Sequence, residues 1–165
     1  MNILILCTGN SARSILAEAL FNRLGEGRVT AFSAGSKPVG AVNPTAIRLL
    51  KAEGHDVSQF RSKSWGEFSG DGAASLDIVL TVCGNAAGET CPIWVGAPIT
   101  VHWGFPDPAG VDGPDHVKLA AFRQVYEVLH KNITALLALD TAATSSEDLR
   151  SELVKIHTAN PPIQF

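Results

Sequence analysis

The stretch ILILCTGNSARS, residues 3–14, joins an apolar run to the start of a helical pattern through a turn that carries a cysteine and an arginine. The apolar run indicates a buried strand over residues 2–6, and leucines at every fourth position indicate a helix over residues 13–24. Cys7 then lies at a strand-to-helix turn, where backbone N–H groups converge and the helix dipole is positive. Because such a turn binds an oxyanion and lowers the pKa of a thiol, it predicts thiolate chemistry on a tetrahedral oxyanion.

The same turn contains further residues that suit an anion. Gly9 lets the backbone pass closely around the ion, and Asn10 tolerates a left-handed conformation and can tie the turn together through its amide. Arg13 offers a planar fork that matches two oxygens of phosphate or arsenate. The predicted substrate-binding residues are Thr8, Gly9, Asn10, Ser11, Ala12 and Ser14, and the Ser14 hydroxyl can also donate to the thiolate. The alternative is a small buried cysteine at a strand end, which is common.

The composition is that of a globular protein without a strong charge bias. The chain has 165 residues, 45% of them hydrophobic, which suits one compact domain over residues 1–165. A net charge of −3 gives no electrostatic footprint for nucleic acid, and no apolar run approaches the ~20 residues that a membrane span requires. The start of the chain lacks the pattern of a signal peptide, so we expect a cytoplasmic location.

Apolar runs and helical stripes alternate along the chain, which predicts an α/β fold of three layers, with a four-stranded parallel sheet flanked by helices. Active sites in such sheets lie at the carboxyl ends of strands, where Cys7, Cys83 and the turn after Trp103 all fall. The remaining expected elements are strands at 29–32, 78–82 and 99–103, a helix from Pro44 to Gly54, a long helix from Phe122 to Leu136 and a last helix after Ser145. Residues 61–75 are expected to form a mobile connection, with a short helix within it as the alternative.

The chain has three cysteines, which are too few, and odd in number, for a disulfide scaffold. Cys83 and Cys91 enclose seven residues, a wider spacing than the two residues typical of zinc knuckles. A disulfide between them requires that residues 84–90 loop back, and the glycines and alanines there make the segment flexible. Taken singly, Cys83 is equally well explained as a core thiol and Cys91 as a half-buried loop thiol.

These motifs resemble the low-molecular-weight protein tyrosine phosphatase family, which carries a nucleophilic cysteine and an arginine in the same Cys-x5-Arg-Ser loop. Residues 82–92 look like the redox segment of the arsenate reductases built on this fold, and residues 102–109 look like their His-Trp-Gly-Phe-x-Asp-Pro segment. Residues 33–35, Ser-Ala-Gly, also fit. The resemblance implies a flavodoxin-like fold and arsenate as substrate, with phosphate and sulfate as inhibitory oxyanions.

The resemblance also implies a role for each thiol. Cys7 would attack arsenic, Cys83 would attack the Cys7 sulfur and release arsenite, and Cys91 would take over the disulfide from Cys7. Thioredoxin would reduce the final Cys83–Cys91 disulfide, and no cofactor or metal is implied. Asp107, held between two prolines, would be the general acid, although a turn-forming aspartate is the alternative for it.

Two other functions remain open from the sequence. The first is a phosphatase for phosphomonoesters, phosphotyrosine included, which would work through a Cys7 phosphoenzyme and use only Cys7, Arg13 and Asp107. The second is a sensor that binds arsenite or a metal through the three thiols without turnover. Residual phosphatase activity is compatible with the arsenate reductase interpretation, because both reactions use the same anion-binding loop.

Two positions depart from the family's pattern. Ala12 stands where many relatives carry a second loop cysteine, which leaves the three-thiol relay untouched. Some reductases of this fold bind a potassium ion through Asn, Glu, Ser and Asp side chains; Asn10, Glu18 and Ser33 match the first three, and Lys63 stands at the fourth place. We therefore expect the Lys63 ammonium to replace the ion by pairing with Glu18, and the activity to be insensitive to potassium.

Overall fold

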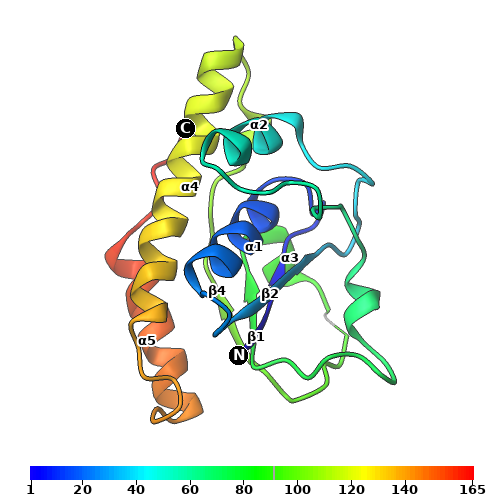
Figure 1. The fold of residues 1–165 in the computed structure, drawn as a ribbon, viewed down its shortest axis with the longest axis vertical. Coiled ribbons are helices and arrows are strands. Elements are labelled where there is room, and N and C mark those ends of the chain that lie inside the picture. Colours follow the sequence, from blue (N-terminus) through cyan, green and yellow to red (C-terminus); the bar gives the residue numbers. More distant parts are fainter. Residues whose placement is uncertain (91) are drawn as a thin grey trace.

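A four-stranded, all-parallel sheet forms the centre of the computed structural model, which describes residues 1–90 and 92–165 (Figure 1). The strand order is β2-β1-β3-β4, so the first strand lies inside the sheet and the second at an edge. The strands are β1 (Asn2–Leu6), β2 (Thr30–Ala34), β3 (Ile78–Thr81) and β4 (Ile99–His102). The predicted α/β fold with a parallel sheet of four strands is therefore confirmed.

Five α-helices and two short 3-10 helices complete the described fold. They are α1 (Arg13–Leu24), α2 (Pro44–Ala52), η1 (Trp65–Phe68), α3 (Gly84–Gly88), η2 (Pro108–Gly110), α4 (Asp115–Leu137) and α5 (Ser146–Ala159). Local capping explains where several of them begin: Asn43 accepts a hydrogen bond from the Thr45 N–H at the start of α2, and Ser145 accepts one from the Asp148 N–H at the start of α5. None of the described helices has the length and apolar character needed to cross a membrane.

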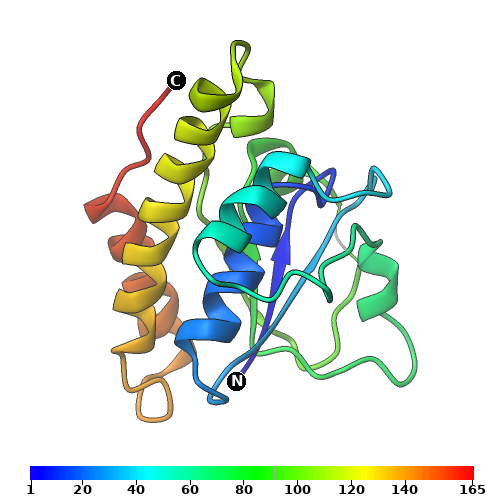
Figure 2. The same ribbon diagram turned by 45° about the horizontal axis from the view of Figure 1, so that its top comes forward.

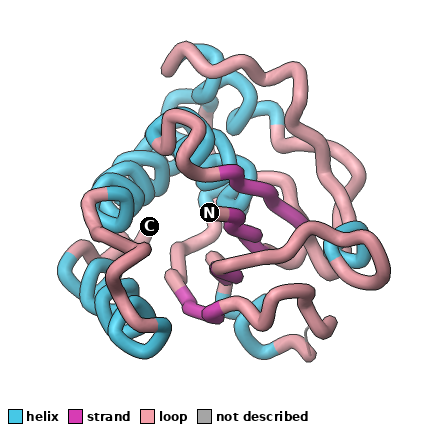
Figure 3. Tube along the Cα trace, turned by 60° about the horizontal axis from the view of Figure 1, so that its bottom comes forward, coloured by secondary structure: helices cyan, strands magenta, loops and turns pink. Residues whose placement is uncertain are grey.

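The two faces of the sheet are covered unequally (Figures 2 and 3). On one face, alternate residues of the central strands, such as Ile3 and Ile5, pack with apolar residues of α1, α2, α4 and α5 in the main core. On the other face, Leu4 and Leu6 belong to a smaller cluster whose outer members include Trp65 and Phe68 of η1. The thick helical layer therefore lies on one side, and a thin layer of η1 and irregular segments lies on the other.

Strand register brings the predicted site together. Leu6 pairs with Ala34 on one side and with Thr81 on the other, and Thr81 pairs in turn with His102. The four strands therefore end level with one another, and the segments that follow β1, β3 and β4 emerge at one edge of the sheet. This places Cys7, Cys83 and the turn after Trp103 side by side, as the sequence predicts.

The segment after β3, whose conformation the sequence left open, forms helix α3 over residues 84–88. The Cys83 sulfur accepts a hydrogen bond from the Ala86 N–H at 3.4 Å and so caps the helix N-terminus in the manner of a serine or asparagine. Cys91, the third predicted thiol of the relay, lies outside the described residues.

Candidate active site

Three carbonyl groups of the loop of residues 7–14 point away from the inside of the loop. The segment of residues 37–43 runs along its outer side, and three backbone N–H groups of that segment donate to loop carbonyls: Lys37 to Thr8 at 3.0 Å, Val39 to Gly9 at 3.1 Å and Asn43 to Ser11 at 2.9 Å. Because a trans peptide places N–H and C=O on opposite sides, the N–H groups that follow these carbonyls face the inside of the loop. The loop therefore forms a concave surface of amide donors that suits an anion.

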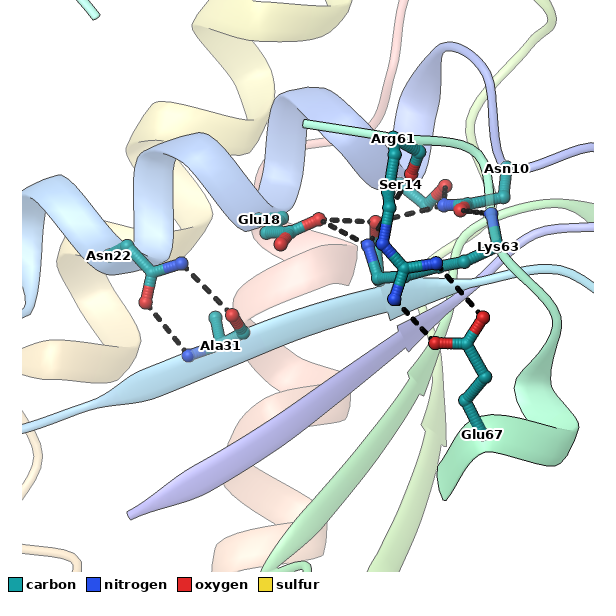
Figure 4. A network of polar contacts seen from close by, with 9 residues as sticks. Asn10, Ser14, Glu18, Asn22, Ala31, Arg61, Lys63 and Glu67 are labelled. Carbon is teal, nitrogen blue, oxygen red and sulfur yellow. Dashed lines mark hydrogen bonds and ion pairs between the residues drawn. The ribbon is translucent and has the colours of Figure 1, made fainter. Parts of the chain in front are cut away.

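Asn10 fixes the shape of the loop from below. Its backbone is left-handed, with φ of 45°, and its side chain is fully buried. The amide nitrogen donates to the hydroxyls of Ser14 at 2.9 Å and Ser33 at 2.8 Å, and the amide oxygen accepts the Lys63 N–H at 2.8 Å (Figure 4). The predicted left-handed conformation and the predicted tie through the amide are both confirmed. In the described structure the Ser14 hydroxyl serves Asn10 as an acceptor.

Gly35 allows β2 to approach the loop. A Cβ atom at this position would lie 2.5 Å from the Thr8 carbonyl oxygen and 3.0 Å from the Cys7 carbonyl oxygen, so any larger residue would push the loop away. The same residue donates its N–H to the Lys63 carbonyl at 2.9 Å. The glycine of the Ser-Ala-Gly segment is thus required by packing against the loop.

Arg13 has an unsatisfied donor inside the site. Its Nη1 donates to the Phe105 carbonyl at 2.9 Å, and its Nη2 lies 3.4 Å from Asp107 Oδ1. Its Nε is buried and has no hydrogen-bond partner among the described residues. Ala12, at the N-cap of α1, is buried and supplies no side-chain cap for the helix N-terminus. A buried guanidinium N–H and an uncapped helix N-terminus beside the same loop are the donors that an oxyanion would satisfy.

Cys7 and Cys83 are both buried free thiols, and each strongly affects the pKa of the other. Cys83 Sγ also accepts the Thr8 N–H at 3.4 Å and the Ala86 N–H at 3.4 Å, and it lies 3.6 Å from the Thr8 hydroxyl. Thr8 follows the end of β1 and Cys83 follows the end of β3, so these contacts join two strand ends that are 75 residues apart in the sequence. Two sulfurs are thus held within reach of each other at the predicted site.

The charge of this thiol pair rests on Cys83, whereas the sequence predicted a lowered pKa for Cys7. The hydrogen bond that Cys7 donates, together with the N–H donors of Ala86 and Thr8, lowers the pKa of Cys83 to about 5. The hydrogen bond to Cys83 and burial raise the pKa of Cys7, and the nearby Arg13 charge offsets this only in part. The loop itself acts in the predicted direction, because Arg13 and the Gly9 backbone lower the pKa of Cys7, but the second sulfur and burial outweigh them.

Asp107 lies at the solvent side of the site. Its side chain is 53% exposed, pairs with Arg13, and accepts the Ala109 N–H at 3.2 Å, which caps η2. Pro106 and Pro108 restrict the backbone on both sides. The carboxyl group therefore stands beside the guanidinium at the mouth of the loop, where it can exchange protons with solvent. Its capping contact also fits the turn-forming alternative.

Lys63 and Glu18 form a buried ion pair beneath the loop, at 3.4 Å between Nζ and Oε2 (Figure 4). Their side chains are 7% and 11% exposed, and the Ser33 hydroxyl donates to the same carboxylate oxygen. Burial raises the pKa of Glu18, against the opposing effects of Lys63 and Ser33. The predicted pairing of these two residues is confirmed. Among the described residues no three His, Cys, Asp or Glu side chains are grouped to hold a metal ion.

Two contacts of the site were missed by the sequence analysis. Thr8 acts on Cys83 through both its N–H and its hydroxyl, whereas the sequence suggested only a contact with substrate. The carbonyl of Phe105 holds the Arg13 guanidinium, and a backbone acceptor leaves no signal in the residue types. The position of Thr8 directly after β1 could have indicated its neighbour at the end of β3, had the strand order been known.

Comparisons with known proteins agree with this geometry. Residues 2–152 match the model of the family described as low molecular weight phosphotyrosine protein phosphatase. An arsenate reductase of Halalkalibacterium halodurans is 38% identical over 131 residues, which cover 79% of this chain and 91% of that protein. The solved structure of an arsenate reductase in the phosphate-binding state has a TM-score of 0.63 and 30% identity, covering 83% of this chain and 96% of the other. A low molecular weight protein tyrosine phosphatase from T. tengcongensis has a TM-score of 0.57 and 27% identity, covering 78% and 95%.

Proposed function

The chain belongs to the low molecular weight phosphotyrosine protein phosphatase family, and within that family we propose that it is an arsenate reductase. It converts arsenate to arsenite through a relay of Cys7, Cys83 and Cys91, and thioredoxin restores the reduced state. The similarity to arsenate reductases over most of their length supports the substrate. The concave donor surface of the loop supports a tetrahedral oxyanion, so phosphate and sulfate compete for the same place.

The contact between the Cys7 and Cys83 thiols carries the proposal. Hydrolysis of a phosphate ester requires one nucleophilic thiol, an arginine and an acid, so a second buried thiol against the first has no part in it. Reduction of arsenate requires two electrons, and a pair of thiols supplies them when they become a disulfide. A second sulfur within contact of the nucleophile therefore favours reduction over hydrolysis.

In the first step, Cys7 condenses with arsenate. The Cys7 sulfur bonds to arsenic, one As–O bond breaks, and the departing oxygen leaves as water with its own proton and the proton of the Cys7 thiol. The raised pKa of Cys7 means that this thiol brings the required proton with it. Asp107, at the mouth of the loop, relays protons to the departing oxygen, and Arg13 with the loop amides holds the remaining oxygens.

In the second step, the Cys83 thiolate attacks the Cys7 sulfur. An S–S bond forms, the S–As bond breaks, and its electron pair stays on arsenic, which falls from the +5 to the +3 state. The arsenite that leaves takes up protons from solvent. After the Cys7 proton has left, the Ala86 and Thr8 N–H groups still donate to the Cys83 sulfur, and they favour its thiolate form for this attack.

In the third step, the Cys91 thiolate attacks Cys83. A Cys83–Cys91 disulfide forms, and Cys7 departs as a thiolate that recovers its proton. Thioredoxin then transfers two electrons to this disulfide and becomes oxidised itself. The relay requires free thiols between turnovers, which fits a reducing compartment such as the cytoplasm.

The test is NADPH oxidation driven by arsenate in the presence of thioredoxin and thioredoxin reductase, with p-nitrophenyl phosphate hydrolysis measured alongside. We expect one NADPH to be consumed for each arsenate, and peptide mapping after arsenate treatment without reductant to find a Cys83–Cys91 disulfide. Three thiols that all stay free after arsenate treatment would contradict the proposal. Turnover with glutathione and glutaredoxin alone would refute the choice of thioredoxin.

A phosphatase is the second candidate function. The match to the phosphatase family model and the likeness to a solved tyrosine phosphatase favour it, because Cys7, Arg13 and Asp107 are the groups such a reaction requires. The two candidates differ in the ratio of the two rates measured above. Efficient hydrolysis of p-nitrophenyl phosphate without arsenate-driven NADPH oxidation would favour the phosphatase.

A further inference from the structure

The C-terminal helix contacts the turn that follows β4. The indole Nε1 of Trp103 donates to the Leu153 carbonyl of α5 at 2.9 Å. One turn further along α5, the His157 ring stacks on Trp103, with ring centroids 6.1 Å apart and 16° between the planes, and it contacts the Phe105 ring at 5.4 Å. The His157 ring therefore contacts both aromatic residues of this turn, Trp103 and Phe105.

The same turn sets the position of Arg13. The Phe105 carbonyl accepts Arg13 Nη1 at 2.9 Å, and Asp107 lies 3.4 Å from Nη2. Because both terminal nitrogens of the guanidinium face this turn, its position determines where the buried, unpartnered Nε points. A displacement of the Phe105 carbonyl would therefore move the group that meets the oxyanion.

The His157 ring is held from a second helix as well. Asn132, a fully buried residue of α4, has its Nδ2 3.3 Å from His157 Nδ1. Burial, together with the neighbouring His102, lowers the pKa of His157 and so favours the neutral ring, in which one nitrogen accepts and the other donates. Fixed by α4, α5 and the turn, the ring is a rigid support.

We infer that His157 is a positioning residue for the anion-binding loop: its ring fixes the turn of residues 103–105 and, through the Phe105 carbonyl, the Arg13 guanidinium. The residue touches no substrate. The inference rests on the proposed function only insofar as Arg13 binds a tetrahedral oxyanion, whichever reaction follows.

The test measures the binding of inorganic phosphate by isothermal titration calorimetry. We expect His157→Ala to weaken phosphate binding about tenfold, because small displacements of a positioning group cost one to two orders of magnitude. His157→Phe keeps the ring contacts and should stay within about twofold of the unmodified protein. His130→Ala, which removes an exposed histidine of α4, is the matched control and should leave binding unchanged. In the arsenate assay, KM should rise by the same factor as the phosphate Kd, with a smaller change in kcat.

Two results would overturn the inference. One is a lowered melting temperature of His157→Ala with an unchanged phosphate Kd, since that is what a merely structural contact would give. If His157→Ala does not fold, His157→Gln, which keeps a hydrogen-bond donor but no ring, replaces it. The second overturning result is a phosphate Kd of His157→Gln equal to that of the unmodified protein. An unmodified protein that binds phosphate but reduces no arsenate would refute the proposed function, and the phosphate measurements would still decide the role of His157.

Discussion

Two buried ionisable pairs contact the loop of residues 7–14, and they handle charge in opposite ways. Glu18 and Lys63 carry opposite charges 3.4 Å apart, so the pair is neutral as a whole. Cys7 and Cys83 are both acids, so the ionisation of one sulfur makes the ionisation of the other more difficult. The first pair is fully partnered, whereas the second holds one proton between two sulfurs.

The difference separates a structural pair from a reactive one. The Glu18 carboxylate also accepts from Ser33, which receives a hydrogen bond from Asn10, so the ion pair is connected to the loop backbone by a closed network. A network with all partners satisfied gives one rigid arrangement. The thiol pair is not part of such a closed network, because the proton between the two sulfurs can leave with a departing oxygen. The loop thus combines a fixed support with a group able to change its state.

Cys83→Ser breaks the thiol pair and should have the largest effect. Serine keeps the size of the side chain but cannot form a disulfide, so arsenate turnover with thioredoxin should fall on the order of a thousandfold or more. The pKa of Cys7 should fall, because no second sulfur holds the shared charge. Hydrolysis of p-nitrophenyl phosphate, measured on the same sample, should stay within a few-fold. Arsenate turnover that survives in this variant would exclude Cys83 from the relay.

Lys63→Met breaks the ion pair and should destabilise the fold by about 3 kcal/mol near pH 8, because Glu18 is left as a buried charge without its partner. Urea unfolding followed by tryptophan fluorescence measures this loss. The pKa of Glu18, already raised by burial, should rise further in the variant. A carboxyl with a raised folded-state pKa is stabilised when protonated, so the deficit should shrink as the pH falls from 8 toward 5.

The control for this experiment is the double variant Glu18→Gln with Lys63→Met, which removes both charges. It should recover part of the stability that the single Lys63 variant loses, because no buried charge remains. A double variant as unstable as the sum of the two single variants would mean that the two side chains do not act as a pair.

Titration of Cys7 and Cys83 tests the difference between the two pairs directly, although the expected effect is smaller than that of the substitutions above. In a Cys91→Ser background, thiolate absorbance at 240 nm should report one sulfur ionised with a pKa of about 5 and a second that stays protonated up to strongly alkaline pH. Cys7→Ala in the same background should raise the pKa of Cys83, since its main hydrogen-bond donor is removed. Two thiols that titrate together near pH 8.5, the ordinary value for cysteine, would mean that the sulfurs do not interact.

Replacement of potassium by sodium should have the smallest effect, namely none. The Lys63 ammonium already stands against Glu18 with little exposure, so we expect no place for a monovalent cation there. Arsenate turnover should be equal in potassium and sodium salts at the same ionic strength. Strong activation by potassium would show that the ion pair does not substitute for a bound ion.

The parts of the fold that depend on neighbours in the sequence were predictable. The bounds of β1 and α1 follow from an apolar run and a leucine stripe, and they agree with the structure to the residue. The N-caps Asn43 and Ser145 likewise depend on contacts within a few residues. The strand ends at which the site would form followed from the general behaviour of parallel sheets.

Features that depend on distant neighbours could not be predicted from the residues alone. The protonation of Cys7 is set by a sulfur that follows another strand. The unequal cover of the sheet arises from the path of the connections around η1, where no regular apolar spacing marks a helix. In each case the deciding partner lies dozens of residues away or is a backbone atom.

The cap of helix α3 has a consequence for the state that follows oxidation. The Cys83 sulfur accepts the Ala86 N–H, and a charged sulfur is a far better acceptor than a neutral one in a disulfide. Disulfide formation at Cys83 therefore removes the main support of a five-residue helix that is too short to persist without one. The oxidation state of Cys83 thus controls whether residues 84–88 are helical, and unfolding of α3 would expose the oxidised segment to a reductant.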